Sequence, residues 1–456
     1  MQPFRYHVFV CDQRKPEGLP CRTTRGSAAV IEALRQEITS QGLLDVVQVT
    51  ACGSLGLCDR GPNLVVYPDG IWYSGVGAVD VPEIVREHFQ NGRPVERLLN
   101  RDGAAVKREI TENRGRMVAA LKAREAAGVL PDELMGMIRG YQESRILLTA
   151  IELDVFTAVE HHAGQATASG IAAELQTDSR ATGLLLNALA ALGLLTKQAD
   201  TFANAPVARR FFVAETPDDA RMAIRHNLSL WTTWSTLTQC VRVGHAVRNR
   251  AMQERGDDWT ASFIAAMHRN AALRAPLMVK AIGAEGIKRL LDVGGGSGAY
   301  SIAFARANPA LHAEVFDLAT VVPIATQHIA EAGLGDRVGT RVGDLRKDVL
   351  GSGYDLVLLS AICHMLAAHE NRDLLRRAFE ALAPGGRLVI QDHIMNADKT
   401  GPRAGALFAI NMLVGTDGGG TYSEDEYAQW LREAGFSQVR RLALPGPNDL
   451  VVAQRP

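Results

Sequence analysis

The chain has 456 residues. A single hydrophobic core does not usually organise so long a chain, so we expect two to four domains. Its 49 lysines and arginines nearly cancel its 50 aspartates and glutamates, and no dense basic segment is present, which argues against a nucleic-acid partner. No apolar run is long enough to span a membrane and the N-terminus lacks signal-peptide features, so we expect a cytoplasmic protein with reduced thiols.

Residues 1–95 are predicted to form a small α/β domain. Asp69-Gly70 lies between two apolar runs and is a typical hairpin turn. The predicted elements are a strand at 6–10, a helix at 27–42, a strand at 44–51 and a hairpin at 63–75.

This first domain carries most of the cysteines of the chain. Clustered thiolates in a reducing compartment indicate a metal site rather than disulfides. Structural zinc usually binds C-x2-C pairs, which are absent here, and thiolates on loops at wider spacing suit an iron–sulfur cluster better. The candidate ligands are Cys11, Cys21, Cys52 and Cys58.

Residues 5–90 resemble the thioredoxin-like [2Fe-2S] ferredoxins. The resemblance rests on the first cysteine pair with Arg25-Gly26, on the run LGLCDRGP at 55–62 and on VVYPDGIWY at 65–73. It implies a bound [2Fe-2S] cluster and a redox partner. In that family the third cysteine would stand at Ser54, whereas this chain has Cys52 two residues upstream. Zinc or an empty fold are the alternatives, and a structural, sensory or electron-transfer role remains open.

Residues 96–130 are predicted to form a charged linker. Val106, Ile110, Met117 and Leu121 keep approximate helical spacing, so the linker can be helical. Its composition is not that of a flexible glycine- and serine-rich tether.

Residues 131–255 are predicted to be helical. Pro131 suits the first turn of a helix, and Leu147, Ile151 and Val155 follow at helical spacing. The run 185–205 then reads as a helix, a turn and a short hairpin, the outline of a winged helix.

A winged helix by itself suggests DNA binding, but the charges of this segment argue otherwise. A surface that contacts phosphates should carry an excess of positive charge. Here the bases Arg180, Lys197, Arg209 and Arg210 are matched by Glu174, Asp178, Asp200 and Glu215.

Residues 256–456 alternate strands and helices, which predicts a mostly parallel, doubly wound sheet. The short turn PGPN joins the last two strands, so we expect them to form an antiparallel edge pair. The predicted strands are 289–293, 312–317, 339–344, 354–360, 386–394, 438–444 and 449–454.

A glycine-rich loop, Gly294-Gly295-Gly296-Ser297-Gly298, follows the first of these strands and precedes a helix. Glycine lets a backbone approach a ligand closely, and ligands of such sheets bind at the carboxyl ends of the strands. The loop also satisfies a loose dinucleotide fingerprint, so by itself it does not identify the ligand.

Two acidic residues follow the next two strands. Asp317 is placed to hold ribose hydroxyls, and Asp344 could meet an adenine amino group with Leu345 against the ring. The alternative is that both carboxylates only cap helices or face solvent. Two of them beside this loop favour a nucleoside ligand.

The order of several motifs resembles the class I methyltransferase core, and more closely the family-2 O-methyltransferases. That family includes plant caffeate-type enzymes and bacterial enzymes that modify carotenoids or bacteriochlorophyll. The resemblance covers residues 131–456. It rests on LLDVGGGSGAYSIAFARANP at 290–309, VFDLATVVP at 315–323, RVGDL at 341–345, LAPGGRLVI at 382–390 and EYAQWLREAGF at 426–436.

The resemblance implies a Rossmann-like α/β sheet in the order 3-2-1-4-5-7-6, preceded by an all-α winged-helix domain that dimerises and closes the substrate pocket. We therefore expect a homodimer rather than a DNA-binding protein. The implied cofactor is S-adenosylmethionine, held by Asp292, Gly294, Gly296, Gly298, Asp317, Leu318, Asp344 and Leu345.

His364 follows the fourth predicted strand and matches the general base of that family, and Asp392 matches an acid that orients it. Histidine suits this task because its pKa lies near the working pH. The alternative is that His364 only lines the pocket or caps a helix. The sequence departs from the family pattern at three supporting positions, which carry Ser360, Met365 and Thr421.

The acceptor is expected to be a small, apolar molecule methylated on oxygen, with sulfur or carbon possible. Met267 matches a position near the transferred methyl, and His226 and Trp231 are candidates for the acceptor pocket. The competing hypothesis is a redox protein in which the adenosylmethionine-binding half is regulatory or repurposed for oxidation or decarboxylation.

Overall fold

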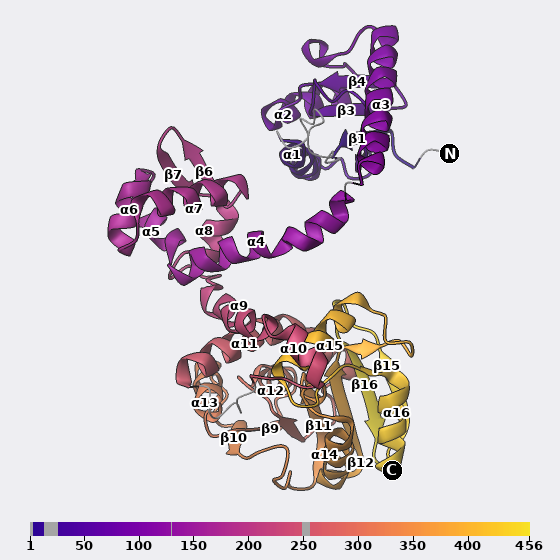
Figure 1. The fold of residues 1–456 in the computed structure, drawn as a ribbon. Helices are drawn as coiled ribbons and strands as arrows, with labels where there is room; N and C mark the ends of the chain where they lie inside the picture. Colours follow the sequence, from indigo (N-terminus) through magenta and orange to yellow (C-terminus); the bar gives the residue numbers. More distant parts are fainter. Residues whose placement is uncertain (1–2, 13–25, 129, 249–255) are drawn as a thin grey trace. The chain divides into compact units, whose positions relative to one another are not determined.

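The computed structural model describes residues 3–12, 26–128, 130–248 and 256–456. The chain divides into two compact units, Met1–Gly140 and Tyr141–Pro456 (Figure 1). In the described part of the chain, no helix combines the length and the apolar character that a membrane crossing requires.

The first unit contains a four-stranded sheet in the order β2-β1-β3-β4. β1 pairs with β2 in parallel and with β3 antiparallel, and β3 and β4 form the hairpin around Asp69-Gly70. Helix α1 buries Val30, Leu34 and Ile38, which recur at helical spacing on one face. The bounds are β1 Tyr6–Cys11, α1 Ser27–Ser40, β2 Val47–Cys52, β3 Asn63–Tyr67, β4 Ile71–Ser74 and α2 Val81–Ile84.

Helix α3 (Gly103–Ala126) occupies most of the segment predicted as a linker. The Asp102 side chain caps it by accepting hydrogen bonds from the first backbone N–H groups. Val106 is buried, and the Asn113 side chain donates a 2.7 Å hydrogen bond to the Gly56 carbonyl. The helix is therefore packed against the loop between Cys52 and Cys58.

The helical region contains a small three-stranded sheet, β5-β7-β6, as a winged helix requires. Val155 does not continue the helix that holds Leu147 and Ile151, because Asp154 adopts a left-handed φ of 58° and a new helix begins. The bounds are α4 Asp132–Glu152, α5 Val155–His161, β5 Ala166–Thr167, α6 Ala168–Leu175, α7 Ser179–Ala191, β6 Leu195–Gln198, β7 Thr201–Asn204, α8 Pro206–Phe212, α9 Arg221–Trp234 and α10 Leu237–Val243.

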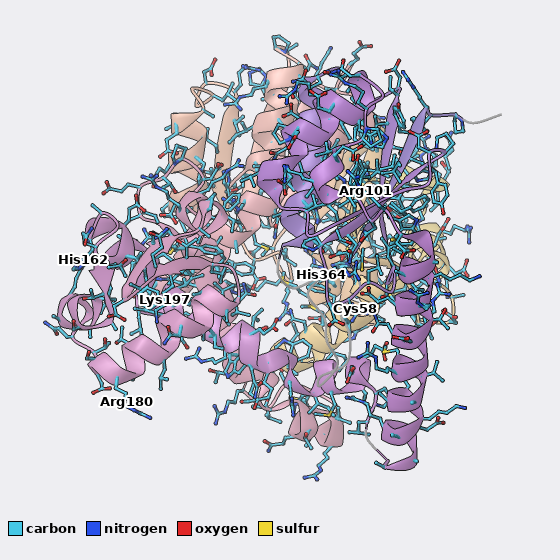
Figure 2. All side chains as sticks on the ribbon, turned by 90° about the horizontal axis from the view of Figure 1, so that it is seen from above. Cys58, Arg101, His162, Arg180, Lys197 and His364 are labelled. Carbon is cyan, nitrogen blue, oxygen red and sulfur yellow. The ribbon has the colours of Figure 1, made fainter. Side chains whose placement is uncertain are left out.

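Charged side chains of this region project into solvent. Arg180 on α7 and Lys197 on β6 are exposed (Figure 2). Lys197 donates to Asn187, and Arg209 forms an ion pair with Glu160. Of these cations, Arg209 is therefore paired with an acid, whereas Lys197 is bonded to a neutral amide.

The C-terminal region contains a seven-stranded sheet in the order β10-β9-β8-β11-β12-β16-β15, which confirms the predicted order 3-2-1-4-5-7-6. β16 is antiparallel to both of its neighbours, as predicted for the last strand pair. The strands are β8 Arg289–Val293, β9 His312–Asp317, β10 Val338–Val342, β11 Tyr354–Ser360, β12 Leu382–Asp392, β15 Ser437–Leu442 and β16 Asp449–Gln454, with the short β13 Ile394–Met395 and β14 Tyr422–Ser423 paired separately.

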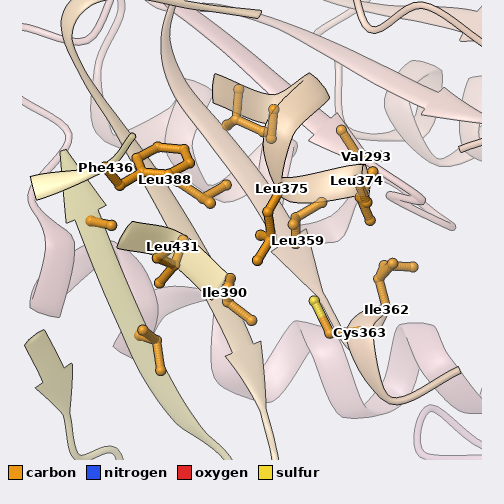
Figure 3. Packing of buried hydrophobic residues seen from close by; sticks show 14 of the residues in the cluster. Val293, Leu359, Ile362, Cys363, Leu374, Leu375, Leu388, Ile390, Leu431 and Phe436 are labelled. Carbon is orange, nitrogen blue, oxygen red and sulfur yellow. The ribbon is translucent and has the colours of Figure 1, made fainter. Parts of the chain in front are cut away.

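Two apolar cores cover the two faces of this sheet. Along β11, Val357 and Leu359 belong to one core while Leu356 and Leu358 belong to the other, as the alternation of a strand buried on both faces requires. Figure 3 shows the first core, which includes Leu359 and Cys363. Helices α14 and α16 contribute to the first core and α11, α12 and α13 to the second. The bounds are α11 Asp257–Ile282, α12 Ala299–Ala307, α13 Val322–Glu331, α14 Ala368–Ala381, α15 Arg403–Gly415 and α16 Glu424–Glu433.

Candidate active site

The glycine-rich loop joins β8 to α12 at the carboxyl edge of the sheet. Gly294, Gly296 and Gly298 have φ values of 67°, 59° and 74°, which residues other than glycine seldom adopt. A Cβ at Gly294 would lie 2.3 Å from Cδ1 of Ile362, whereas at Gly296 the nearest atom is 3.9 Å away. The loop therefore packs tightly at its start and leaves open space beside Gly296.

Asp317 ends β9 and holds the glycine loop in place. Its Oδ2 accepts a 2.8 Å hydrogen bond from the Gly296 N–H, and its Oδ1 accepts one of 2.7 Å from Leu318. Burial raises the pKa of Asp317, and the two N–H groups lower it. A carboxylate has about four acceptor positions, so capacity for further donors remains.

Asp344 follows β10 and organises a turn. Its Oδ1 accepts a 2.9 Å hydrogen bond from the Arg346 N–H, and its own N–H donates to Asp348. A Cβ placed on Gly294 would be 3.4 Å from Cδ2 of Leu345, so the Leu345 side chain flanks the loop. The structure thus brings the predicted residues of three strand ends to the same edge of the sheet.

Asp292 is fully buried below the loop. The Ser301 hydroxyl donates to its Oδ2 at 2.9 Å, while Oδ1 has no hydrogen-bond partner among the described residues. Burial raises the pKa of Asp292 to about 7, and the hydrogen bond from Ser301 opposes that shift.

A second buried network lies at the ends of β11 and β12, and no sequence motif indicated it. The Gln391 Oε1 accepts hydrogen bonds from Tyr300 at 2.5 Å and from Ser360 at 2.7 Å. Its amide Nε2 has no partner among the described residues, although Gln391 is only 2% exposed. The two bonds at the oxygen fix the orientation of this free donor.

His364 and Asp392 form a buried pair at the same edge (Figure 2 labels His364). His364 Nδ1 lies 2.8 Å from Asp392 Oδ1, and the His364 backbone N–H donates to Oδ2 at 3.0 Å. Because a carboxylate only accepts, it holds the proton on Nδ1 and leaves the lone pair on Nε2. The arrangement can therefore take up a proton at Nε2.

Phe408 of α15, which no motif indicated, contacts two histidine rings. It meets His364 edge-on with ring centroids 4.8 Å apart, and it lies 4.5 Å from His393. Burial lowers the pKa of His393, whose backbone N–H donates to Asp392 Oδ1 at 2.8 Å. The neighbouring Cys363 is fully buried and its thiol pKa is raised by burial, so it is a packing residue.

An aromatic cluster lies between α9 and α11. Trp259 and Phe263 stack with centroids 5.1 Å apart and an angle of 8°, and His226 meets both rings edge-on. Trp231, the other candidate for the acceptor pocket, lies under the guanidinium of Arg145, whose Cζ is 5.8 Å from the ring centroid.

Two of the predicted ligand cysteines of the first unit, Cys11 and Cys52, lie on neighbouring strands. Cys11 and Cys52 stand opposite each other in the register of the parallel strands β1 and β2, at the ends of both. Cys58 Sγ lies 3.5 Å from Ser54 Oγ. Burial and the proximity of Cys11 raise the pKa of Cys52. Cys21 lies outside the described residues, and within those that are described no group of three or more potential ligands is placed to hold a metal ion.

Comparison with known protein families agrees with this geometry. Residues 240–437 match the O-methyltransferase domain family, and residues 135–214 match the O-methyltransferase dimerisation domain. The 3-hydroxy-5-methyl-1-naphthoate 3-O-methyltransferase of Streptomyces sahachiroi is 36% identical over 332 residues, covering 70% of this chain and 94% of that protein.

Further relatives and solved structures agree. The S-adenosyl-L-methionine-dependent methyl transferase PigF of Serratia sp. (strain ATCC 39006) is 29% identical over 71% of this chain and 95% of its own length. The structure of PigF with SAH has a TM-score of 0.67 at 28% identity, covering 72% of this chain and 100% of that one. An O-methyltransferase family protein from Burkholderia thailandensis has a TM-score of 0.65 at 27% identity, covering 71% and 97%. The chain therefore belongs to the O-methyltransferase family and is an S-adenosylmethionine-dependent methyltransferase.

Proposed function

We propose that this enzyme methylates a hydroxyl oxygen of a small aromatic acceptor, with His364 as the general base. The observation that carries the proposal is the buried His364–Asp392 pair, which lies at the same sheet edge as the glycine loop. General bases of this kind typically contribute about 10²–10⁴-fold to the rate.

The buried polar atoms around the loop fit the amino-acid end of adenosylmethionine. Asp292 Oδ1 is an acceptor without a partner and Gln391 Nε2 is a donor without a partner among the described residues. An ammonium and a carboxylate are the complementary groups, and unpaired buried polar atoms cost free energy. The residues proposed to hold the cofactor are Asp292, Gly294, Gly296, Gly298, Asp317, Leu318, Asp344 and Leu345.

When bound, the cofactor supplies an electrophilic methyl group on a sulfonium sulfur. The chain itself provides the base and its orientation. His364 Nε2 accepts the proton of the acceptor hydroxyl, and Asp392 stabilises the imidazolium that results. Phe408, edge-on to the imidazole, restricts rotation of the ring.

The aromatic cluster of α9 and α11 supports an aromatic acceptor. Trp259 and Phe263 offer a stacked apolar wall, and offset or edge contacts with a further ring are favourable by about 0.5–1.5 kcal/mol each. The naphthoate substrate in the name of the Streptomyces relative has the same aromatic character.

A homodimer is proposed to bury the exposed apolar face of α4. Leu134, Met137, Ile138 and Tyr141 are all more than two-fifths exposed, at spacings of three and four residues. The match of residues 135–214 to a dimerisation domain supports the same assembly. We take 131–255 as this domain and 256–456 as the catalytic one.

The first unit is proposed to be a thioredoxin-like domain that binds a [2Fe-2S] cluster, over residues 1–95, with 96–130 linking it to the rest. Its sheet order β2-β1-β3-β4 with a parallel β1–β2 pair supports the fold, and the neighbouring Cys11 and Cys52 support the ligand set. Cys21 and Cys58 are the other proposed ligands. A redox partner would follow from a bound cluster.

Incubation with methyl-labelled cofactor and a panel of phenols, naphthols and their thiol analogues tests the reaction. We expect labelled methyl ethers from the wild type and a loss of about 10²-fold or more in His364→Ala, with S-adenosylhomocysteine affinity unchanged. His369→Ala removes an exposed histidine nearby and serves as the control. Full turnover in His364→Ala would contradict the assigned base.

Anaerobic purification tests the first unit separately. We expect a coloured protein with equal iron and acid-labile sulfide, and loss of both in Cys11→Ser. A colourless protein that contains zinc, or no metal, would exclude the iron–sulfur assignment without affecting methyl transfer.

A further inference from the structure

A groove of about 700 Å³ lies on the face formed by α11, α12 and α13, away from His364. Its volume is in the range of small-molecule sites. Ala275, Ala299, Ala303 and Ala307 line it, and these short side chains leave apolar surface where larger residues would fill the space.

The charged residues of the groove are mainly cations. Lys280 and Arg306 line it and, within the described residues, neither forms an ion pair. Glu331 is the one carboxylate among the lining residues, and it lies 3.7 Å from the imidazole of His328. Two uncompensated cations beside apolar surface complement an anion that has an apolar body.

The opposite part of the groove borders the glycine-rich loop, Gly294 to Gly298. His268 Nδ1 lies 2.8 Å from the Ser297 hydroxyl, between the positive-φ glycines of that loop. The His268 ring stacks on His328 with centroids 4.1 Å apart and an angle of 11°. Ser297 is only 4% exposed, so a ligand that moves His268 also disturbs the loop.

We propose that this groove is a second binding site for an elongated organic carboxylate, which holds its acid group at Lys280 and Arg306 and is coupled to cofactor binding through His268 and Ser297. The twelve residues from His268 to Lys280 correspond to about 18 Å along a helix, which suits a chain rather than a compact ligand. Coupling between two sites is reciprocal, so the cofactor changes the affinity for the carboxylate by the same factor.

Calorimetric titration of the full chain with decanoate, and with decanol as the uncharged counterpart, tests the site. We expect decanoate to bind at least about tenfold more tightly than decanol. The double variant Lys280→Glu/Arg306→Glu should lower the affinity for decanoate by about tenfold or more. Ala303→Trp, which fills the groove without altering its charge, should lower that affinity to a similar extent. Arg114→Glu/Lys122→Glu makes the same charge change on exposed positions of α3 and should leave the affinity for decanoate unchanged.

The coupling is read from S-adenosylhomocysteine affinity with and without saturating decanoate. We expect a change of about threefold or more, which His268→Ala abolishes. Equal decanoate affinity in the wild type and the Lys280/Arg306 variant would overturn the proposal, as would absent binding. If the charge reversal instead shifts the monomer–dimer equilibrium in sedimentation and decanoate does not bind, a second copy of the chain occupies the groove and the proposal fails.

Discussion

His364 donates two hydrogen bonds to the carboxylate of Asp392, one of 2.8 Å from the ring Nδ1 and one of 3.0 Å from the backbone N–H. Both groups are buried, with exposures of 7% and 1%. The carboxylate therefore fixes the position and the tautomer of the ring together.

Asp392→Asn should lower kcat by about 10²-fold or more, because an amide can also donate and no longer enforces the proton on Nδ1. S-adenosylhomocysteine affinity, measured by calorimetry, should stay within about twofold. Asp336→Asn, which removes an exposed carboxylate just before β10, is the matched control. An Asp392→Asn enzyme with wild-type kcat would show that the carboxylate does not orient the base.

Asp292 should make the stability of the catalytic unit depend on pH. Its pKa is raised to about 7, against about 4 in an unfolded chain, so between these values the folded protein binds the extra proton and stability falls as pH rises. From about pH 5 to about pH 8 the loss attributable to this group should reach a few kcal/mol.

Asp292→Asn isolates that contribution. Its unfolding temperature, measured by calorimetry, should decline less than that of the wild type over the same pH range. Saturating S-adenosylhomocysteine should reduce the difference, because its ammonium favours the ionised carboxylate. Parallel pH curves for the two proteins would mean that Asp292 is not protonated in the folded state.

The sheet of the catalytic region could be predicted because its signals are local. Each strand is a short apolar run, and the glycines that begin α12 require a backbone that no other residue adopts easily. Placing Asp317 beside Gly296 needed only the rule that parallel strands end at one edge.

The rest of the site depends on contacts between distant residues, which leave no periodicity or spacing to read. Gln391 accepts from Tyr300, 91 positions away, and from Ser360 on the neighbouring strand. Phe408 reaches His364 because α15 packs there, and His268 meets Ser297 from another helix. For the same reason His268 and His393 stand in no motif of the sequence.

Gly294→Ala should destabilise the catalytic unit and weaken cofactor binding. The new Cβ would lie 2.3 Å from Ile362 at a φ of 67°, so both the backbone and the packing oppose it. Gly286→Ala is the matched control, since its φ is 75° but nothing lies within 4 Å of its Cβ position. We expect the free energy of unfolding to fall by about 1 kcal/mol in the control and by about 2–4 kcal/mol in Gly294→Ala. Equal losses of stability in the two variants, measured by thermal unfolding, would show that the contact with Ile362 does not oppose a side chain at Gly294.

Asn113→Ala should loosen the cysteine loop of the first unit. The Asn113 amide donates at 2.7 Å to the carbonyl of Gly56, and Ile110 of the same helix packs against that glycine. Without the amide the buried carbonyl loses its partner, at a cost of about 1–3 kcal/mol. The loop between Cys52 and Cys58 should then exchange its amide hydrogens faster by about tenfold or more.

Hydrogen exchange followed by mass spectrometry on the full chain resolves this effect, because peptides of the catalytic unit provide an internal reference. Glu112→Ala, an exposed neighbour on α3, should leave exchange in the loop unchanged. If a cluster is bound, Asn113→Ala should also release iron to a chelator faster than either the wild type or Glu112→Ala. Since α3 contributes both Ile110 and Asn113 to this contact, unchanged exchange in Asn113→Ala would mean that apolar packing alone holds the loop.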